Sequence, residues 1–111
     1  MSKASKSKGV RAGFTEYDQR VGKAWSLHIH GQSEAAIAEF ERLVDEWRDH
    51  IDANYGLALA YKGAGRHDQA RAQFQKVREY IQAEQTKQVG EDTSRFQMLL
   101  RMVEQHLATL N

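Results

Sequence analysis

Histidine is the residue type in this chain with the widest chemical range, because it can ligate metals and can transfer protons near neutral pH. The sequence holds five histidines and no cysteine. His28 and His30 stand two positions apart, which on a helix places them on different faces, so a shared metal ion is not expected. A polar surface position is the better interpretation for most of the five, which are His28, His30, His50, His67 and His106.

Other groups that could do chemistry are equally dispersed. Without cysteine there is no disulfide, no thiolate nucleophile and no cysteine-ligated metal. The glycines stand singly, and none belongs to a glycine-rich phosphate loop. The neighbouring carboxylates Glu39/Glu41 and Asp45/Glu46 follow the pattern of solvated helix charges. We therefore expect no enzyme, and no catalytic, cofactor-binding or metal site.

Charge is divided unevenly along the 111 residues, whose net charge is +1. Four basic residues and no acidic ones lie within the first eleven positions, so the remaining chain is slightly acidic. We expect residues 1–13 to form a flexible basic tail, followed by one domain over residues 14–111. So few charges, without interleaved aromatic residues, do not favour a nucleic-acid partner. Because no apolar run approaches the roughly 18 residues of a membrane span and no secretory signal is evident, we expect no membrane association and a cytoplasmic location.

The elements that must position any functional groups are helices. From Thr15 onward the sequence is rich in Ala, Glu, Gln, Arg and Leu, and its apolar residues recur at spacings of three and four. Asp18 stands where it would complete a capping box with Thr15. The predicted boundaries are a first helix from Thr15 to Gly31, a second from near Ser33, a third from a cap at Asp49 or Asp52 to Gly65, a fourth that can run well past the length of the second before Gly90, and a last from Asp92 or Thr93.

The strongest pattern is an internal repeat with a period of 34 residues. Small residues recur where two helices would approach closely, glycines recur at the turns, and aromatic residues recur where they would fill the space between successive helical hairpins. The matched pairs are Ala24/Ala58, Leu27/Tyr61, Gly31/Gly65, Ala36/Ala70, Phe40/Phe74 and Leu43/Val77.

With these residues the sequence resembles the tetratricopeptide repeat family. The stretch ANYGLALAYKGAGRHDQARAQFQKV, residues 53–77, carries most of the family's signature positions. The resemblance implies an all-α solenoid of two helical hairpins, with repeat one at residues 17–50 and repeat two at residues 51–84. Residues 92–110 then form a capping helix, whose apolar stripe from Phe96 to Leu110 covers the second hairpin.

Several positions depart from the family pattern. Lys23 stands where a leucine is usual, and Arg20 and Asn54 occupy the positions of the family's tryptophan. The proline near the end of each repeat is replaced by Arg48 and Gln82. The missing prolines affect where the helices end and not the expected fold.

The resemblance also implies a binding surface, because in this family the first helices of successive hairpins line a concave groove that receives a peptide or a helix. Some members grip a chaperone tail's carboxylate there with Lys and Asn; Val21, Trp25 and Gly56 occupy those places, so that ligand is not expected. Alternatively, Trp25, Tyr55 and Leu59 pack only against one another or the tail. The implied groove residues are Val21, Trp25, His28, Ile29, Tyr55, Leu59 and Lys62, together with Asp18 and Asp52.

Two hypotheses about function follow. The first is a non-catalytic interaction module or adaptor that binds a peptide or helix of a partner in an apolar groove. The second is a structural or assembly subunit buried in a homo-oligomer or a larger complex. Stacked repeats normally need about three units for stability, and Trp47 and the stripe from Phe96 to Leu110 offer apolar surface to a second chain.

Overall fold

The computed structural model describes residues 15–87 and 94–110, and the predicted basic tail at residues 1–13 lies outside them. The described residues are almost entirely helical and contain no strand, so the predicted all-α class is confirmed. Helix α4 is longer than α2, as the absence of proline and glycine in its sequence predicts. The helices are α1 (Glu16–Ile29), α2 (Ser33–Glu46), α3 (Ile51–Gly63), α4 (His67–Lys87) and α5 (Ser94–Leu110).

Helix α1 begins with the predicted capping box. The Thr15 hydroxyl accepts a hydrogen bond from the Asp18 backbone N–H at 3.2 Å, and the Asp18 carboxylate accepts one from the Thr15 N–H at 2.9 Å. The two glycines of the repeat, Gly31 and Gly65, both have φ +79° and close the turns after α1 and α3. Only glycine adopts this conformation without steric cost, which explains the residue at both turns.

The predicted cap of the third helix is wrong. Helix α3 begins at Ile51, its N-cap is His50, and neither Asp49 nor Asp52 caps it. Instead, the Asn54 side chain reaches back from the first turn and donates to the His50 carbonyl at 2.7 Å and to the Arg48 carbonyl at 2.9 Å. The start of α3 is therefore fixed from inside the helix. The predicted starts of the last helix, at residues 92 and 93, lie outside the described residues.

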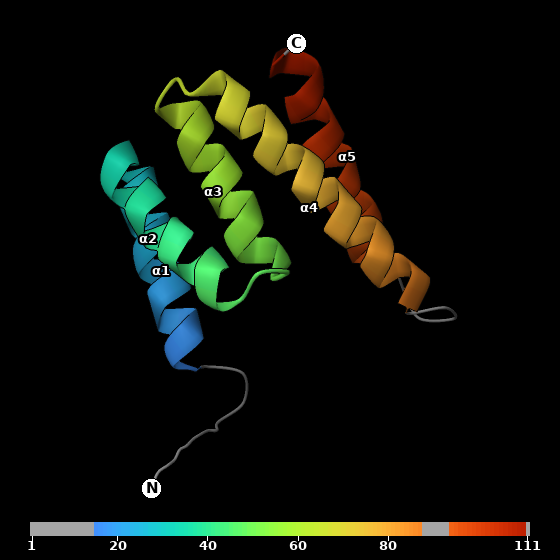
Figure 1. The fold of residues 1–111 in the computed structure, drawn as a ribbon, viewed down its shortest axis with the longest axis horizontal. Helices are drawn as coiled ribbons and strands as arrows, with labels where there is room; N and C mark the ends of the chain where they lie inside the picture. The colour runs from blue at the N-terminus through green and yellow to red at the C-terminus, as the bar shows by residue number, and fades with distance from the viewer. Residues whose placement is uncertain (1–14, 88–93, 111) are drawn as a thin grey trace, which may run out of the picture.

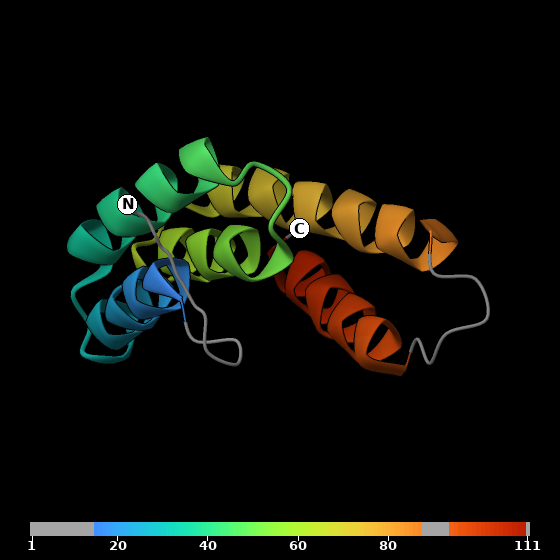
Figure 2. The same cartoon turned by 90° about the horizontal axis from the view of Figure 1, so that it is seen from below.

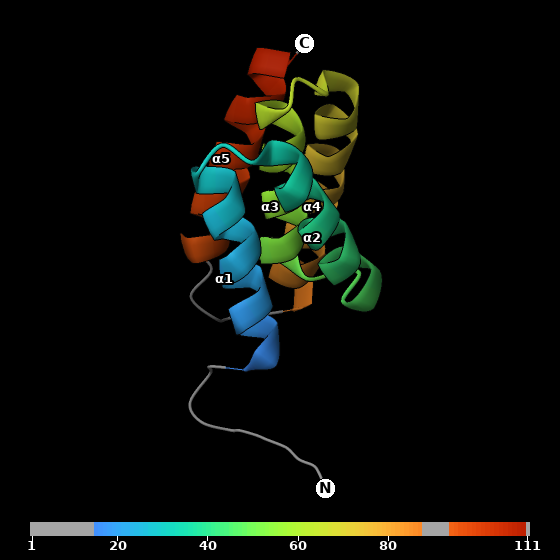
Figure 3. The same ribbon diagram turned by 90° about the vertical axis from the view of Figure 1, so that its left-hand side faces the viewer.

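The helices form two curved layers. Figure 1 shows successive antiparallel helices across the molecule, and Figure 3 looks onto the first hairpin, with α1 and α2 in front. Viewed as in Figure 2, α1, α3 and α5 form one layer, and α2 and α4 form the other. Within the first layer α3 is set back between α1 and α5, so this side of the molecule is concave. We call the side chains that α1, α3 and α5 present here the inner face.

The repeated residues build the core as predicted. Ala24, Ala36, Ala58 and Ala70 are completely buried at the helix contacts. Because Ala adds only a methyl group, the two helices of each hairpin can approach closely. The ring of Phe40 lies against the backbone of α3, so close that a Cβ on Gly56 would lie 2.4 Å from it. The aromatic side chain of one hairpin therefore packs against the next.

Helix α5 covers the second hairpin with the predicted stripe. Its side chains at Phe96, Val103, Leu107 and Leu110 are buried, and those at positions 99 and 100 are partly buried against the same core. The carbonyl of Leu110 accepts a hydrogen bond from the Arg71 guanidinium of α4. The last helix therefore packs on the second hairpin along the whole described length of α5.

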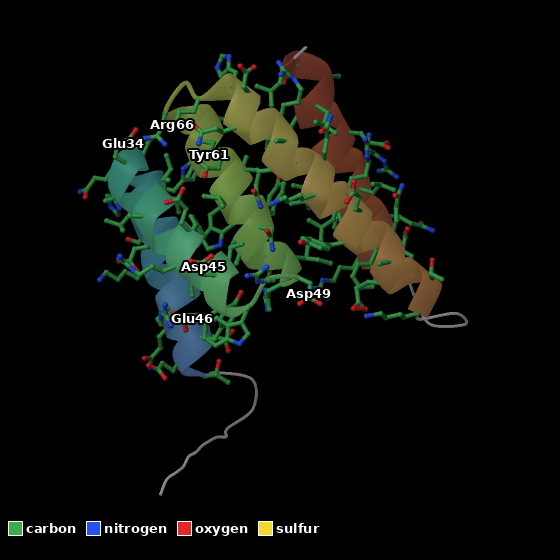
Figure 4. The ribbon with its side chains drawn as sticks, viewed as in Figure 1. Glu34, Asp45, Glu46, Asp49, Tyr61 and Arg66 are labelled. Atoms are coloured by element: carbon green, nitrogen blue, oxygen red, sulfur yellow. The ribbon has the colours of Figure 1, made fainter. Side chains whose placement is uncertain are left out.

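Side chains also join the two hairpins at the outer layer. Arg66, in the turn before α4, forms an ion pair with Glu34 at the start of α2, and Figure 4 shows both side chains at the same end of the molecule. The Tyr61 hydroxyl donates to the Glu41 carboxylate at 2.7 Å. These contacts fix the relative position of the hairpins and hence the curvature of the inner face.

Candidate binding surface

Helix α3 forms the floor of the inner face. Both flanks of this helix are covered by neighbours, so almost all of its side chains are buried. Apart from Ile51 at its start, the exposed or partly buried residues lie along one narrow stripe at Asp52, Leu59, Lys62 and Gly63. The Leu59 side chain is partly buried and packs on the core. The floor of the inner face therefore consists of one apolar side chain, Leu59, with the Asp52 carboxylate toward the start of α3 and the Lys62 ammonium toward its end.

Aromatic rings support this floor from beneath. The Trp25 ring of α1 meets Phe40 edge-on with centroids 5.5 Å apart, and lies 6.4 Å from the Tyr55 ring. Tyr55 is only 8% exposed and also contacts Phe74, at 6.0 Å between centroids. The structure thus brings Trp25 and Tyr55 together as predicted, but Tyr55 belongs mainly to the core, and Trp25 keeps part of its surface open.

Helix α1 forms one wall of the inner face. Val21 and His28 are partly buried, and the His28 ring lies against α3 beside Gly63. Ile29, by contrast, is 74% exposed, the largest exposure of any large apolar residue in the described chain. Exposed apolar area of this size costs free energy in water unless another surface covers it. This wall therefore ends in an uncovered apolar residue.

Helix α5 forms the opposite wall, which the sequence reasoning missed. Its His106 and Thr109 side chains contact Lys62 of α3, so this stripe of α5 faces the inner side. Met98 and Met102 lie on the same stripe at intervals of four residues before His106, and they are 56% and 38% exposed. The four-residue spacing of these residues is a signal in the sequence, but it runs beside the stronger apolar stripe that forms the core contact.

His106 links this wall to the floor. Its ring stacks on Phe74, with centroids 4.7 Å apart and planes 7° from parallel. The Lys62 ammonium approaches its Nδ1 at 2.9 Å, and the Tyr55 hydroxyl lies 3.4 Å from its Nε2. Because an ammonium can only donate, Nδ1 carries no proton here, and in the neutral ring the proton is on Nε2. Burial, and then the Lys62 charge, lower the pKa of His106 below its usual value.

The histidines as a group fit the sequence prediction only in part. His30 and His67 are exposed, as predicted for a polar surface. His28, His50 and His106 are partly buried instead, and His106 joins three helices, since it sits on α5 and contacts α3 and α4. Their burial arises from contacts between residues far apart in sequence, which spacing along the chain does not reveal.

The described residues offer no site for metal chemistry. Nowhere among them do three or more His, Asp or Glu side chains gather closely enough to hold a metal ion. In the same part of the chain, no helix combines the length and apolar character needed to cross a membrane. The inner face offers apolar and aromatic side chains between α1 and α5, together with the Lys62 ammonium.

Comparisons with known proteins agree with this architecture. Neither the curated proteins nor the solved structures include a significant match to the chain. The sequence profile of the tetratricopeptide repeat, whose members generally mediate protein–protein interactions and are typically non-catalytic, matches residues 27–102. The match runs from the first hairpin into α5 and covers more than half of the chain. The chain therefore belongs to the tetratricopeptide repeat family.

Proposed function

We propose that the protein is a non-catalytic adaptor whose inner face binds an apolar peptide or helix of a protein partner. The observation that carries the proposal is the exposure of large apolar side chains on both walls: Ile29 on α1, and Met98 and Met102 on α5. Between them lies the partly buried Leu59 of α3. A partner segment seated over Leu59 would cover all four side chains, and methionine adapts its shape easily to a ligand.

Two neighbouring helices pack with their axes about 8–10 Å apart. In this proposal one helix of the partner lies above Leu59, between α1 and α5. An apolar stripe on such a helix would meet Trp25 on one side and Met102 on the other. Aromatic side chains that are rigid and partly open are the type most often found as binding hot spots. In this proposal Trp25 is an anchor and the buried Tyr55 is its support.

The predicted groove residues divide by role under this proposal. Those with open surface contact the partner directly, and those already packed hold the floor in place. The first group is Val21, Trp25, Ile29, Leu59 and Lys62, with Met98 and Met102 added from α5, and the second is His28 and Tyr55.

A set of surface substitutions tests the proposal. Ile29→Lys, Leu59→Lys and Met102→Lys each place a charge where the partner's apolar side chains would lie. Ile29 and Met102 are exposed, and circular dichroism checks that the Leu59 variant, whose original side chain packs on the core, is folded. Ala38→Lys, at an exposed position of α2, is the matched control. In affinity capture from cell extract followed by mass spectrometry, proteins held by the wild type and the control should be lost from each inner-face variant, by at least about tenfold. Capture that is unchanged in all three variants contradicts the proposal.

The alternative is an assembly subunit whose apolar surface is buried permanently by another copy or by a larger complex. Trp47, which is 38% exposed at the end of α2, favours this alternative because it lies away from the inner face. The side of α1 that points away from α3 argues against this alternative. Its exposed residues Gln19, Lys23 and Ser26 offer no apolar area to a stacked copy. Light scattering separates the two: an adaptor is a stable monomer, and a subunit of a homo-oligomer is not.

A further inference from the structure

Lys62 is an unneutralised charge at the upper end of the inner face. Among the described residues no carboxylate lies within 4.0 Å of the Lys62 ammonium. The cations that do form ion pairs in this part of the chain are Arg20, Arg42, Arg66, Arg71 and Lys87. Its polar contacts are His106 Nδ1 at 2.9 Å and the Thr109 hydroxyl at 3.5 Å. An ammonium has three donors, so one is left for a ligand.

His106 positions this charge without neutralising it. Because Nδ1 accepts from Lys62, the imidazole is neutral in this arrangement, and the net charge of the pair stays at +1. The ring itself is held by its stacking on Phe74, so the ammonium is tethered to a fixed support. A partly buried, tethered cation interacts with an anion more strongly than a mobile surface lysine does, because less side-chain entropy is lost on binding.

The Lys62 ammonium lines a depression of about 470 Å³ between α3 and α5, and this depression has room for the end of an acidic side chain. The amide of Gln105 lines it and can donate to a carboxylate, whereas the Thr109 hydroxyl beside it donates to the His106 carbonyl at 2.9 Å. Leu59 lies three residues before Lys62 on α3, so the apolar floor and the cation are neighbours on the same helix face. An apolar contact and an anionic contact are thus offered about one helical turn apart.

We propose that this depression receives an aspartate or glutamate side chain of the partner segment that occupies the inner face. The inference rests on the proposed function and adds the partner's chemistry to it: an apolar stripe followed, about one turn later, by a carboxylate. The depression lies at Lys62, Gln105 and Thr109, away from the places of the free-carboxylate grip, which Val21, Trp25 and Gly56 occupy. A side-chain carboxylate is therefore the expected group, and a free chain end is not needed.

Selection from a phage-displayed library of 16-residue helical peptides, fused through their C-termini, tests this directly because no free carboxyl end is present. We expect binders with an apolar stripe and a fixed Asp or Glu one turn from it. The best binder is then synthesised with an amidated end, together with its Glu→Gln or Asp→Asn counterpart, and both are titrated by fluorescence anisotropy.

The wild type should bind the acidic peptide about tenfold more tightly than its amide counterpart. In Lys62→Met, which keeps the apolar stem but removes the charge, the difference should fall below about twofold, and Lys62→Arg should retain most of it. Lys76→Met, which removes an exposed charge of α4, should behave as the wild type. Circular dichroism checks that each variant is folded.

The outcomes separate the two proposals. Binders without an acidic preference, or a preference that persists in Lys62→Met, overturn the carboxylate subsite and leave the inner-face binding intact. A library that yields no binder, or binders unaffected by Leu59→Lys, overturns both.

Discussion

The two hairpins secure the first turn of their inner helices in different ways. The positions compared, Arg20 and Asn54, are 34 residues apart and equivalent in the repeat. Arg20 of α1 forms two 2.8 Å bonds to the exposed carboxylate of Glu46 and lies over the Trp47 ring at 5.6 Å. Asn54 of α3 is fully buried, binds two loop carbonyls and accepts from the Gln73 amide at 2.6 Å.

The difference follows from where each hairpin stands in the stack. Arg20 and Glu46 keep 27% and 48% of their side-chain surface exposed, so a charged pair is tolerated there. The second hairpin is covered by α2 on one side and α5 on the other, and an ion pair in such a place must repay a large desolvation cost. A neutral amide whose hydrogen bonds are all made avoids that cost. The two equivalent positions therefore both join an inner helix to a neighbouring segment, but with different residues, and the start of α1 itself is held by the capping box of Thr15 and Asp18.

The largest expected difference is between the stabilities of Asn54→Ala and Arg20→Ala, which each remove one of these two side chains. Asn54→Ala leaves the Gln73 amide and the Arg48 carbonyl without their partner, while the His50 carbonyl keeps its bond from the backbone N–H of residue 54, and should lower the free energy of unfolding by about 2–4 kcal/mol. Arg20→Ala breaks a pair that is screened by water and salt, so its loss should be much smaller. Urea unfolding followed by circular dichroism measures both. Equal losses would show that the two side chains are energetically alike and break the comparison.

A second contrast lies at Gly22 and Gly56, also 34 residues apart. A methyl group on Gly56 would collide with the Phe40 ring at 2.4 Å, and one on Gly22 would meet nothing within 4 Å. Gly56→Ala should therefore cost about 1–3 kcal/mol through overpacking. Gly22→Ala should stabilise by roughly 0.5–1 kcal/mol, because glycine is a poor residue in a helix interior. Opposite signs in thermal unfolding confirm this contrast, and a stable Gly56→Ala variant contradicts the packing.

The sequence predicted the fold well because its signals are local and repeated. The turn glycines at positions 31 and 65 and the buried phenylalanines at positions 40 and 74 occupy the predicted places. The start of α3 escaped prediction because the group that fixes it is the Asn54 side chain, four residues after the N-cap. Capping rules look for a polar residue at the cap itself, where this chain has His50.

The candidate site was predicted less completely, because it depends on contacts between helices. Trp25 and Leu59 lie on the inner face and keep open surface, as the family resemblance implied. Tyr55 is buried, and the contribution of Met102 was missed, because both facts depend on where α5 packs. Position within a repeat predicts which face a residue occupies, and only the neighbouring helix decides whether that face stays open.

The smallest contrast concerns what covers the equivalent rings Phe40 and Phe74. Phe40 meets Trp25 and the α3 backbone, whereas Phe74 is covered by His106, a titratable group. Since burial and Lys62 lower the pKa of His106 in the folded chain, the unfolded chain binds the proton more readily. The stabilising contribution of the neutral ring is complete above the unfolded pKa, near 6.5, and is lost progressively as the pH falls below it.

Thermal unfolding between pH 7.5 and pH 5 tests this link between the second hairpin and α5. The wild type should lose more stability over that range than His106→Gln, which can still accept from Lys62 but does not titrate. His30→Gln, a change at an exposed histidine of the first hairpin, should follow the wild type. If His106→Gln loses as much stability as the wild type, the ring is not held neutral against Phe74. The acid sensitivity would then arise from groups outside the α3–α5 contact, and the Lys62 charge would lack its fixed support.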